Sequence, residues 1–307
     1  MYHPNEKNVD LERDYLPSMH SKRFQDQPNP DLAVIENHLK LCAQHTNDLV
    51  TKHGVKVETL RYAGVDDRQV VDVYCKPEAN NGKLFVYVHG GYWQEMDKEH
   101  SGSIVLPLVK RGYRVAVMEY NLCPQVTLTQ LLDQFTQFLL WVFDYAERTA
   151  TTEIHFAGHS AGAHLMAQLF HVPQLISTER RQKVKTVFFM GGVYDLRELW
   201  PLKGVNPNNL LSLDANNCNE LSPMLWPWHA DSASWAGTQS YVLTAENESV
   251  TFKEQSREFA KLLQEAGFSV SFKLFDRYDH FDIIEECVED DSTITQYLLA
   301  ALGKATK

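Results

Sequence analysis

The chain has 307 residues, a length that a single α/β domain can reach and that allows a large core with a substrate pocket. Its 29 Lys and Arg residues stand against 40 Asp and Glu residues, so the formal net charge is −11, which argues against nucleic acid and against an anionic membrane surface as partners. Hydrophobic residues make up 44% of the chain, an ordinary share for a globular protein.

The sequence carries no sign of export or of membrane insertion. Residues 1–20 are polar and lack the apolar core of a secretory signal, and no apolar run approaches the length of a membrane span. The cysteines are widely spaced and form no C-x-x-C pair, which favours free thiols in a reducing compartment: Cys42, Cys75, Cys123, Cys218 and Cys287. We therefore expect a cytoplasmic protein.

The first third of the chain predicts one helix followed by strands. Helical periodicity predicts a helix over 29–50. Alternating residues predict strands over 55–63 and 68–77, with Gly64 in the turn between them. The next strand, over 83–91, is almost continuously apolar, which is typical of a parallel sheet covered on both faces.

From residue 98 onward the predicted helices and strands alternate. The periodic segments predict helices over 98–111, 127–149, 161–171, 251–266 and 281–302. The apolar runs predict strands over 113–122, 153–158, 184–196, 240–246 and 269–275. This alternation indicates an α/β fold with a mainly parallel central sheet and helices on both faces.

One segment, 197–239, interrupts the alternation. It is rich in Trp, Pro and Asn, and we expect a small cap or insertion over the sheet edge that carries pocket or lid residues. We expect a single domain over 1–307, with a helical N-terminal segment over 1–50.

A pentapeptide between the strand at 153–158 and the following helix fits the nucleophile elbow G-x-S-x-G: Gly158-His159-Ser160-Ala161-Gly162. In that motif a serine sits on a strained strand-to-helix turn, and the glycines are needed because side chains would clash with the neighbouring strand and helix. The alternative is a tight turn without chemistry. The strand before and the helix after favour Ser160 as a nucleophile, and with it the α/β-hydrolase fold.

A second motif, His89-Gly90-Gly91-Tyr92-Trp93, ends the buried strand 83–91. In α/β-hydrolases such a loop donates backbone N–H groups to the oxyanion of the tetrahedral intermediate, together with the residue after the nucleophile. The predicted donors are Gly91, Tyr92 and Ala161. Two glycines in a tight turn are the structural alternative.

A general base and an acid complete a triad in the chain order of α/β-hydrolases. His280 follows the last predicted strand and is the predicted base. Glu248, in the loop after strand 240–246, is the first choice of acid, because its side chain lies past the strand end. Glu246 is the second choice, and Asp195 the third, although an Asp near a helix start is more often an N-cap.

The sequence lacks the motifs of metal-dependent hydrolysis, of phosphate binding and of dinucleotide binding. The sequence has no H-E-x-x-H, no phosphate-binding G-x-x-x-x-G-K-[ST] and no G-x-G-x-x-G fingerprint. His159 and His164 flank the serine five residues apart, which is not the spacing of two ligands on one helix face. We expect His164 to be a packed residue behind Ser160.

These motifs resemble the kynurenine formamidase (arylformamidase) family. The resemblance runs from about residue 80 to 300 and is carried by the two glycine motifs, by His280-Phe281-Asp282 and by the loop 247–259. It implies hydrolysis of N-formyl-L-kynurenine to L-kynurenine and formate in tryptophan breakdown, without a cofactor or metal. One position departs from the family, which usually carries Asp where this chain has Glu248.

The resemblance also implies roles for particular residues. Ser160 attacks the formyl carbon, His280 acts as base and then as acid, and aromatic rings stack on the aniline ring of the substrate. Trp93 and Tyr194 are the first candidates for that stacking, with core packing as the alternative for each. Two other functions stay open: a carboxylesterase for small acyl esters, and an inactive hydrolase-like binding protein. The oligomeric state is also open, with a homodimer as one alternative.

Overall fold

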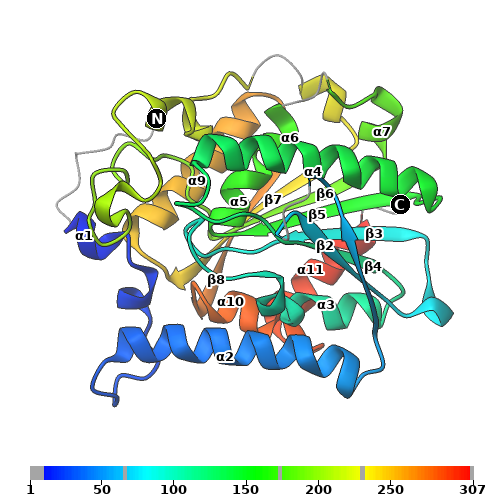
Figure 1. The fold of residues 1–307 in the computed structure, drawn as a ribbon, viewed down its shortest axis with the longest axis horizontal. Helices are drawn as coiled ribbons and strands as arrows, with labels where there is room; N and C mark the ends of the chain where they lie inside the picture. The colour runs from blue at the N-terminus through cyan, green and yellow to red at the C-terminus, as the bar shows by residue number, and fades with distance from the viewer. Residues whose placement is uncertain (1–9, 65–67, 172–174, 229–231, 305–307) are drawn as a thin grey trace.

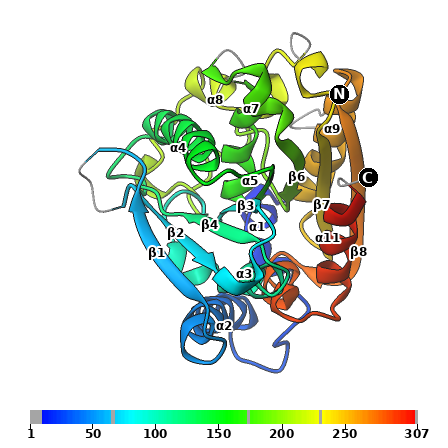
Figure 2. The ribbon, with the colours of Figure 1, turned by 90° about the vertical axis from the view of Figure 1, so that its right-hand side faces the viewer.

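The computed structural model describes residues 10–64, 68–171, 175–228 and 232–304, built around one eight-stranded sheet (Figures 1 and 2). The strands in chain order are β1 (Lys56–Arg61), β2 (Val70–Cys75), β3 (Lys83–Val88), β4 (Arg114–Met118), β5 (Glu153–His159), β6 (Val184–Met190), β7 (Gln239–Asn247) and β8 (Ser269–Asp279). Their spatial order is β1-β2-β4-β3-β5-β6-β7-β8. The pairs β1–β2 and β2–β4 are antiparallel and the other neighbours are parallel, so the predicted mainly parallel sheet is confirmed.

Helices cover both faces of the sheet (Figure 1). One face carries α4 (Leu128–Arg148), α5 (Ala161–Met166) and α9 (Val250–Glu265), and the other carries α3 (Gly102–Val109), α10 (Asp282–Glu285) and α11 (Thr293–Lys304). The long helix α2 (Pro30–Thr51) packs on α3. Shorter helices are α1 (Leu11–Asp14), α6 (Gln168–His171), α7 (Thr178–Gln182) and α8 (Asn217–Glu220). None of the helices in the described ranges is long and apolar enough to cross a bilayer.

The alternation of side chains along β3 explains why this strand reads as one apolar run. Leu84, Val86 and Val88 belong to the core cluster under α4 and α9. Phe85 and Tyr87, between them, belong to the cluster under α3 and α11. Successive side chains of a strand point to opposite faces, so a strand buried on both faces needs apolar residues at every position.

Several predicted strands end earlier than the sequence indicated. The predictions 83–91, 113–122 and 184–196 were too long, because β3, β4 and β6 end at Val88, Met118 and Met190. The following residues leave the sheet at its carboxyl edge and stay buried without strand pairing. Apolar character reports burial and does not distinguish a strand from a buried loop, which is why these ends were misplaced.

Three predicted helices are interrupted. The prediction 281–302 resolves into α10, the 3₁₀ turn η8 (Glu286–Val288) and α11, because Ser292 starts a new helix by accepting the Thr295 N–H at 3.2 Å. The prediction 98–111 resolves into η3 (Lys98–His100) and α3, and the prediction 161–171 into α5 and α6. For 197–239 the sequence predicted an insertion but none of its secondary structure, such as α8. This segment connects β6 to β7 and packs Trp228 against Phe259 of α9.

Truncating the core under α4 should be costly. Phe135 is fully buried in the α4–α9 cluster, so Phe135→Ala should lower the free energy of unfolding by about 3–5 kcal/mol. Leu32 on α2 is 48% exposed, and Leu32→Ala should change the same quantity by less than about 0.5 kcal/mol. Urea unfolding followed by circular dichroism measures both. Equal effects of the two substitutions would contradict the described packing.

Candidate active site

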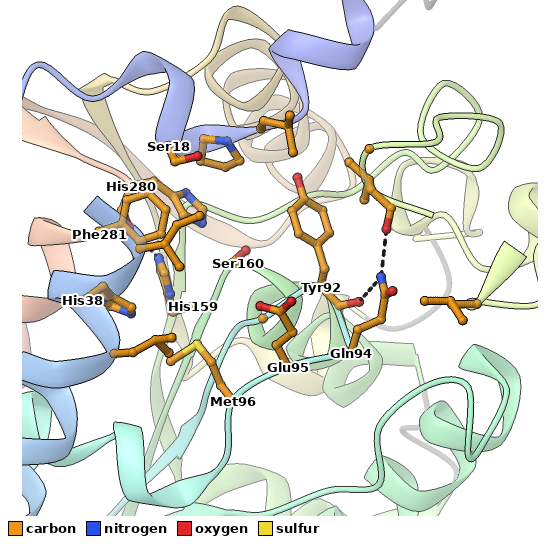
Figure 3. Close-up of a pocket in the computed structure, with 18 of the residues that line it drawn as sticks. Ser18, His38, Tyr92, Gln94, Glu95, Met96, His159, Ser160, His280 and Phe281 are labelled. Carbon is orange, nitrogen blue, oxygen red and sulfur yellow. Dashed lines mark hydrogen bonds between the residues drawn. The ribbon is translucent and has the colours of Figure 1, made fainter. Parts of the chain in front are cut away.

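The carboxyl ends of β3, β5 and β8 meet at one cavity of about 390 Å³ (Figure 3). Gly91 follows β3, Ser160 follows β5 and His280 follows β8, and all three line this cavity. Parallel strands bring their carboxyl ends to the same edge of the sheet, and this edge is where open α/β folds build their sites. The loops that follow these strands therefore carry the candidate chemistry.

Ser160 adopts the strained turn that the elbow motif requires. Its backbone has φ 53° and ψ −119°, and its N–H donates to the Met190 carbonyl at 2.8 Å. The neighbouring glycines leave room for this turn. A Cβ on Gly162 would lie 2.2 Å from the Val88 carbonyl oxygen, and a Cβ on Gly158 would lie 2.3 Å from the Gly162 carbonyl oxygen. The hydroxyl is thereby presented at the end of the sheet, facing the cavity (Figure 3).

A buried hydrogen bond joins Glu248 to His280. The distance between Glu248 Oε2 and His280 Nδ1 is 2.5 Å, and both residues are less than 5% exposed. The other carboxylate oxygen of Glu248 accepts the Ser249 N–H at 3.0 Å. A carboxylate on Nδ1 keeps the proton on that nitrogen and leaves Nε2 as the basic atom of the imidazole.

The two other acid candidates do not contact His280. Glu246 is exposed and accepts the Arg277 N–H at 2.7 Å, at an irregularity in the β7–β8 pairing next to Ala245. Asp195 is buried and paired with Arg197, with 2.5 Å between Asp195 Oδ2 and Arg197 Nη2. Of the three candidates, the fold brings Glu248 to the imidazole.

His159, the second residue of the elbow motif, holds the backbone of His280. Its Nε2 lies 2.8 Å from the His280 carbonyl oxygen, and the two rings are 4.6 Å apart. Burial, reinforced by the charge of His280, lowers the pKa of His159 well below its usual value, so the ring is neutral and donates one N–H. The edges of Phe252 and Phe281 pack against the His280 ring. No sequence signal indicated this support.

A hydrogen-bonded peptide orients the loop after β3. The Gly90 carbonyl accepts from Tyr120 Oη at 3.0 Å and from His89 Nδ1 at 2.8 Å. Burial lowers the pKa of His89 to about 4, so its ring stays neutral and stacks on Tyr120 at 4.2 Å. In a trans peptide the N–H points opposite to the C=O, so the Gly91 N–H is directed away from these partners.

The predicted backbone donors stand around Ser160. Gly91 has φ 101°, and a Cβ there would lie 2.3 Å from the Glu95 carbonyl oxygen, so this position requires glycine. Gly91 and Tyr92 line the cavity, and Ala161 is the first residue of α5, whose N–H has no acceptor within the helix. Gly91, Tyr92 and Ala161 remain the candidates for the N–H groups that an oxyanion on a Ser160 adduct would need.

The predicted stacking residues lie in the core. Trp93 is fully buried against His164, and Tyr194 is fully buried and stacked on Phe259 at 4.0 Å, and neither lines the cavity. This geometry argues against both as substrate contacts and favours the packing alternative. His164 is also fully buried, with Nε2 2.8 Å from the Leu221 carbonyl oxygen, as expected for a packed residue.

Sequence reasoning expected pocket residues in 197–239 without naming them, and it missed the part of the cavity wall that the N-terminal segment and α2 supply. The N-terminal segment supplies Leu16, Pro17 and Ser18, α2 supplies Ile35, His38 and Leu39, and 197–239 supplies Gly204, Val205, Pro207 and Leu210. The aromatic rings among the lining residues are those of Tyr92 and Phe281. Burial alone would lower the pKa of His38, but hydrogen bonds with Cys42 and Glu285 outweigh it and raise the pKa to about 9. No motif marks these residues, because they come together only through folding.

The described residues contain no group of three or more His, Cys, Asp or Glu side chains arranged to hold a metal ion. Together, the parallel sheet, the elbow at Ser160 and the Glu248–His280 pair at the strand ends define an α/β-hydrolase. The BD-FAE family model matches residues 71–201, which include the elbow and the His-Gly-Gly loop.

Sequence and structure comparisons agree with this class and narrow it. The chain is 54% identical to a kynurenine formamidase of Drosophila melanogaster over 97% of this chain and 98% of that protein. It is 31% identical to a kynurenine formamidase of Danio rerio over 79% of this chain and 80% of that protein. A solved structure from Silicibacter sp. tm1040, provisionally assigned as a thioesterase, aligns with a TM-score of 0.71 at 25% identity, covering 96% of this chain and 99% of its own. The chain belongs to the kynurenine formamidase family.

The geometry around His280 predicts that Glu248 matters far more for activity than Glu246. Glu248→Gln should lower kcat by on the order of 10³ or more, because an amide cannot hold the imidazole in the required tautomer or stabilise its charged form. Glu246→Gln should change kcat less than about threefold, because the exposed Glu246 carboxylate accepts from the Arg277 backbone and is not hydrogen-bonded to the imidazole. Steady-state hydrolysis by both purified variants measures this, and the reverse ranking would move the acid to Glu246.

Proposed function

We propose that this chain hydrolyses N-formyl-L-kynurenine to L-kynurenine and formate, with Ser160 as nucleophile, His280 as general base and acid, and Glu248 as the orienting carboxylate. One observation carries the proposal: in a member of the kynurenine formamidase family, Ser160 and the hydrogen-bonded Glu248–His280 pair converge on one cavity. The reaction needs a nucleophile, a proton carrier and oxyanion donors, and the cavity offers residues for each role.

In the first half of the reaction, Ser160 Oγ attacks the formyl carbon while His280 Nε2 takes its proton. The N–H groups of Gly91, Tyr92 and Ala161 stabilise the oxyanion that forms on the formyl oxygen. His280 then gives the proton to the departing aryl nitrogen, which leaves as the amine of L-kynurenine. The formyl group remains on Ser160 as an ester.

In the second half, water attacks this formyl ester. His280 takes a proton from the water, the same N–H groups hold the second oxyanion, and formate leaves as Ser160 regains its proton. The backbone at Gly90 lies close to the serine, since a Cβ on Gly90 would lie 2.9 Å from Ser160 Cβ. A formyl group is the smallest acyl group and suits such a site. The aryl ring of the substrate lies against Tyr92 or Phe281, the aromatic rings that line the cavity.

The proposal extends to the organisation of the chain. Residues 1–307 act as one domain, and 197–239 act as a lid, because Gly204, Val205, Pro207 and Leu210 line the cavity. The five cysteines are free thiols, which supports a cytoplasmic location.

The test is hydrolysis of N-formyl-L-kynurenine by the purified protein, followed by the absorbance of kynurenine. A p-nitrophenyl ester serves as a second substrate and Ser160→Ala as the control. We expect efficient deformylation, poorer ester cleavage, and loss of at least about 10³ in kcat for both substrates in Ser160→Ala, with the fold intact by circular dichroism. Ester cleavage without deformylation would make the chain a carboxylesterase, and residual activity in Ser160→Ala would remove the nucleophile assignment.

A further inference from the structure

The N-terminal residues 10–23, here called the brace, cross the loops that carry the site (dark blue in Figure 1). Glu12 accepts the Lys203 and Gly204 N–H groups at 2.8 Å each, which ties the brace to the 197–239 segment. The Tyr15 carbonyl accepts from Tyr92 Oη at 2.5 Å, which ties it to the loop after β3. Ser18 of the brace lies on the wall of the cavity that holds His280 (Figure 3).

At its carboxyl end the brace holds two carboxylates on either side of His280. Arg23 Nε donates to Asp279 Oδ2 at 2.8 Å, and Arg23 Nη1 donates to Glu285 Oε2 at 2.6 Å. Ser21 Oγ donates to the same Asp279 oxygen at 2.5 Å. Both carboxylates are almost fully buried, so the guanidinium is a partner they need.

Asp279 in turn closes the backbone turn that carries His280. Its Oδ1 accepts the Phe281 N–H at 2.8 Å and the Asp282 N–H at 2.9 Å. Arg23 and Ser21 hold the other oxygen, Oδ2, so they fix the orientation of the carboxylate as a whole. The position of the His280 ring therefore depends on contacts made by the brace.

At its amino end the brace holds the acid loop. Asp14 is 3% exposed, and its two oxygens accept the Val250 N–H at 3.2 Å and the Thr251 N–H at 2.9 Å. These are the first N–H groups of α9, which have no acceptor inside the helix. Glu248 precedes them by two residues, so Asp14 fixes the loop from which Glu248 reaches His280.

We infer that residues 10–23 are a positioning element for the Glu248–His280 pair, with Arg23 the positioning residue on the histidine side and Asp14 on the acid side. The inference rests on the proposed function, since it assigns these residues a role in the same triad. Neither residue touches the substrate: Asp14 and Arg23 act through the backbone turns that carry the two triad members.

Arg23 also balances charge beside the general base. Burial raises the pKa of Asp282, and the negative charge of Asp279 raises it further. Burial also raises the pKa of Asp279, but the positive charge of Arg23 counteracts this effect, and the pKa of Asp279 lies below its usual value. Among the described residues, the titratable or charged groups that contact the His280 segment are Glu248 from the β7–α9 loop, His159 from β5, His38 from α2 and Arg23 from the brace, and the segment itself carries Asp279, Asp282 and Glu285. Glu95, from the loop after β3, lines the same cavity.

The test compares Arg23→Gln and Arg23→Lys with a matched arginine elsewhere. Arg23→Gln should lower kcat about tenfold or more with less than about threefold change in KM, because a misplaced imidazole affects the chemical step more than binding. The acid limb of its kcat/KM profile should move to higher pH, because Asp279 and Glu285 lose their compensating charge. Arg23→Lys keeps the charge but not the forked geometry, so it should keep the wild-type acid limb with an intermediate kcat.

Arg180 is the matched control. Its side chain is 24% exposed against 26% for Arg23, and it also bridges two carboxylates, those of Asp144 and Glu147, away from the cavity. Arg180→Gln should leave kcat and the pH profile unchanged.

On the side of Glu248, Asp14→Asn should lower kcat without a comparable change in KM.

Each variant is assayed below its melting temperature with two substrates, N-formyl-L-kynurenine and a p-nitrophenyl ester. The rate at which a fluorophosphonate labels Ser160 is measured as well. If the wild type cleaves the ester and is labelled but does not deformylate, the proposed substrate fails while the positioning role is still measured. Wild-type kcat and an unmoved acid limb in folded Arg23→Gln would overturn the positioning role, as would an equal loss in Arg180→Gln. If Arg23→Gln does not fold, an unchanged kcat and labelling rate in both Arg23→Lys and Asp14→Asn would overturn it instead.

Discussion

The close backbone contact between the β5–α5 turn and the end of β3 is the constraint on which the site depends. Gly162 lies so near the Val88 carbonyl that no side chain fits, and a Cβ on Gly90 would lie 2.9 Å from Ser160 Cβ. This contact sets the distance between the serine and the loop that carries Gly91 and Tyr92. Ser160 and the loop of Gly91 and Tyr92 are therefore placed by one packing interaction between backbones, with little freedom for either to move separately.

Glu248 and His280, the proposed partners of Ser160, depend on the pairing of β7 with β8 at one edge of the sheet. The β7–β8 pairing is irregular next to Ala245, which leaves Glu246 on the exposed side against the Arg277 backbone. Two residues later, Glu248 lies inside and reaches the imidazole. Gly191 leaves room beside this pair, since a Cβ there would lie 3.2 Å from His280 Nδ1 and 3.6 Å from Glu248 Oε2.

The N-terminal segment connects these two halves of the site, although it is farthest from them in sequence. Asp14 and Arg23 contact the acid and histidine loops across more than 230 residues of chain. Buried carboxylates and free helix N–H groups both require partners, and here one segment supplies both. The same segment also forms part of the cavity wall, through Leu16, Pro17 and Ser18.

The sequence by itself determined the mainly parallel sheet, the elbow at Ser160, the His-Gly-Gly loop and the location of His280, because each is marked by local periodicity, by a short motif or by its place after a strand. Only the tertiary structure distinguished Glu248 from Glu246 and Asp195, placed Trp93 and Tyr194 in the core, and brought residues 16–18 and α2 to the cavity wall. These features depend on which buried groups meet across the fold. The type of a residue indicates whether its side chain will be buried, but it does not indicate which residues will surround that side chain.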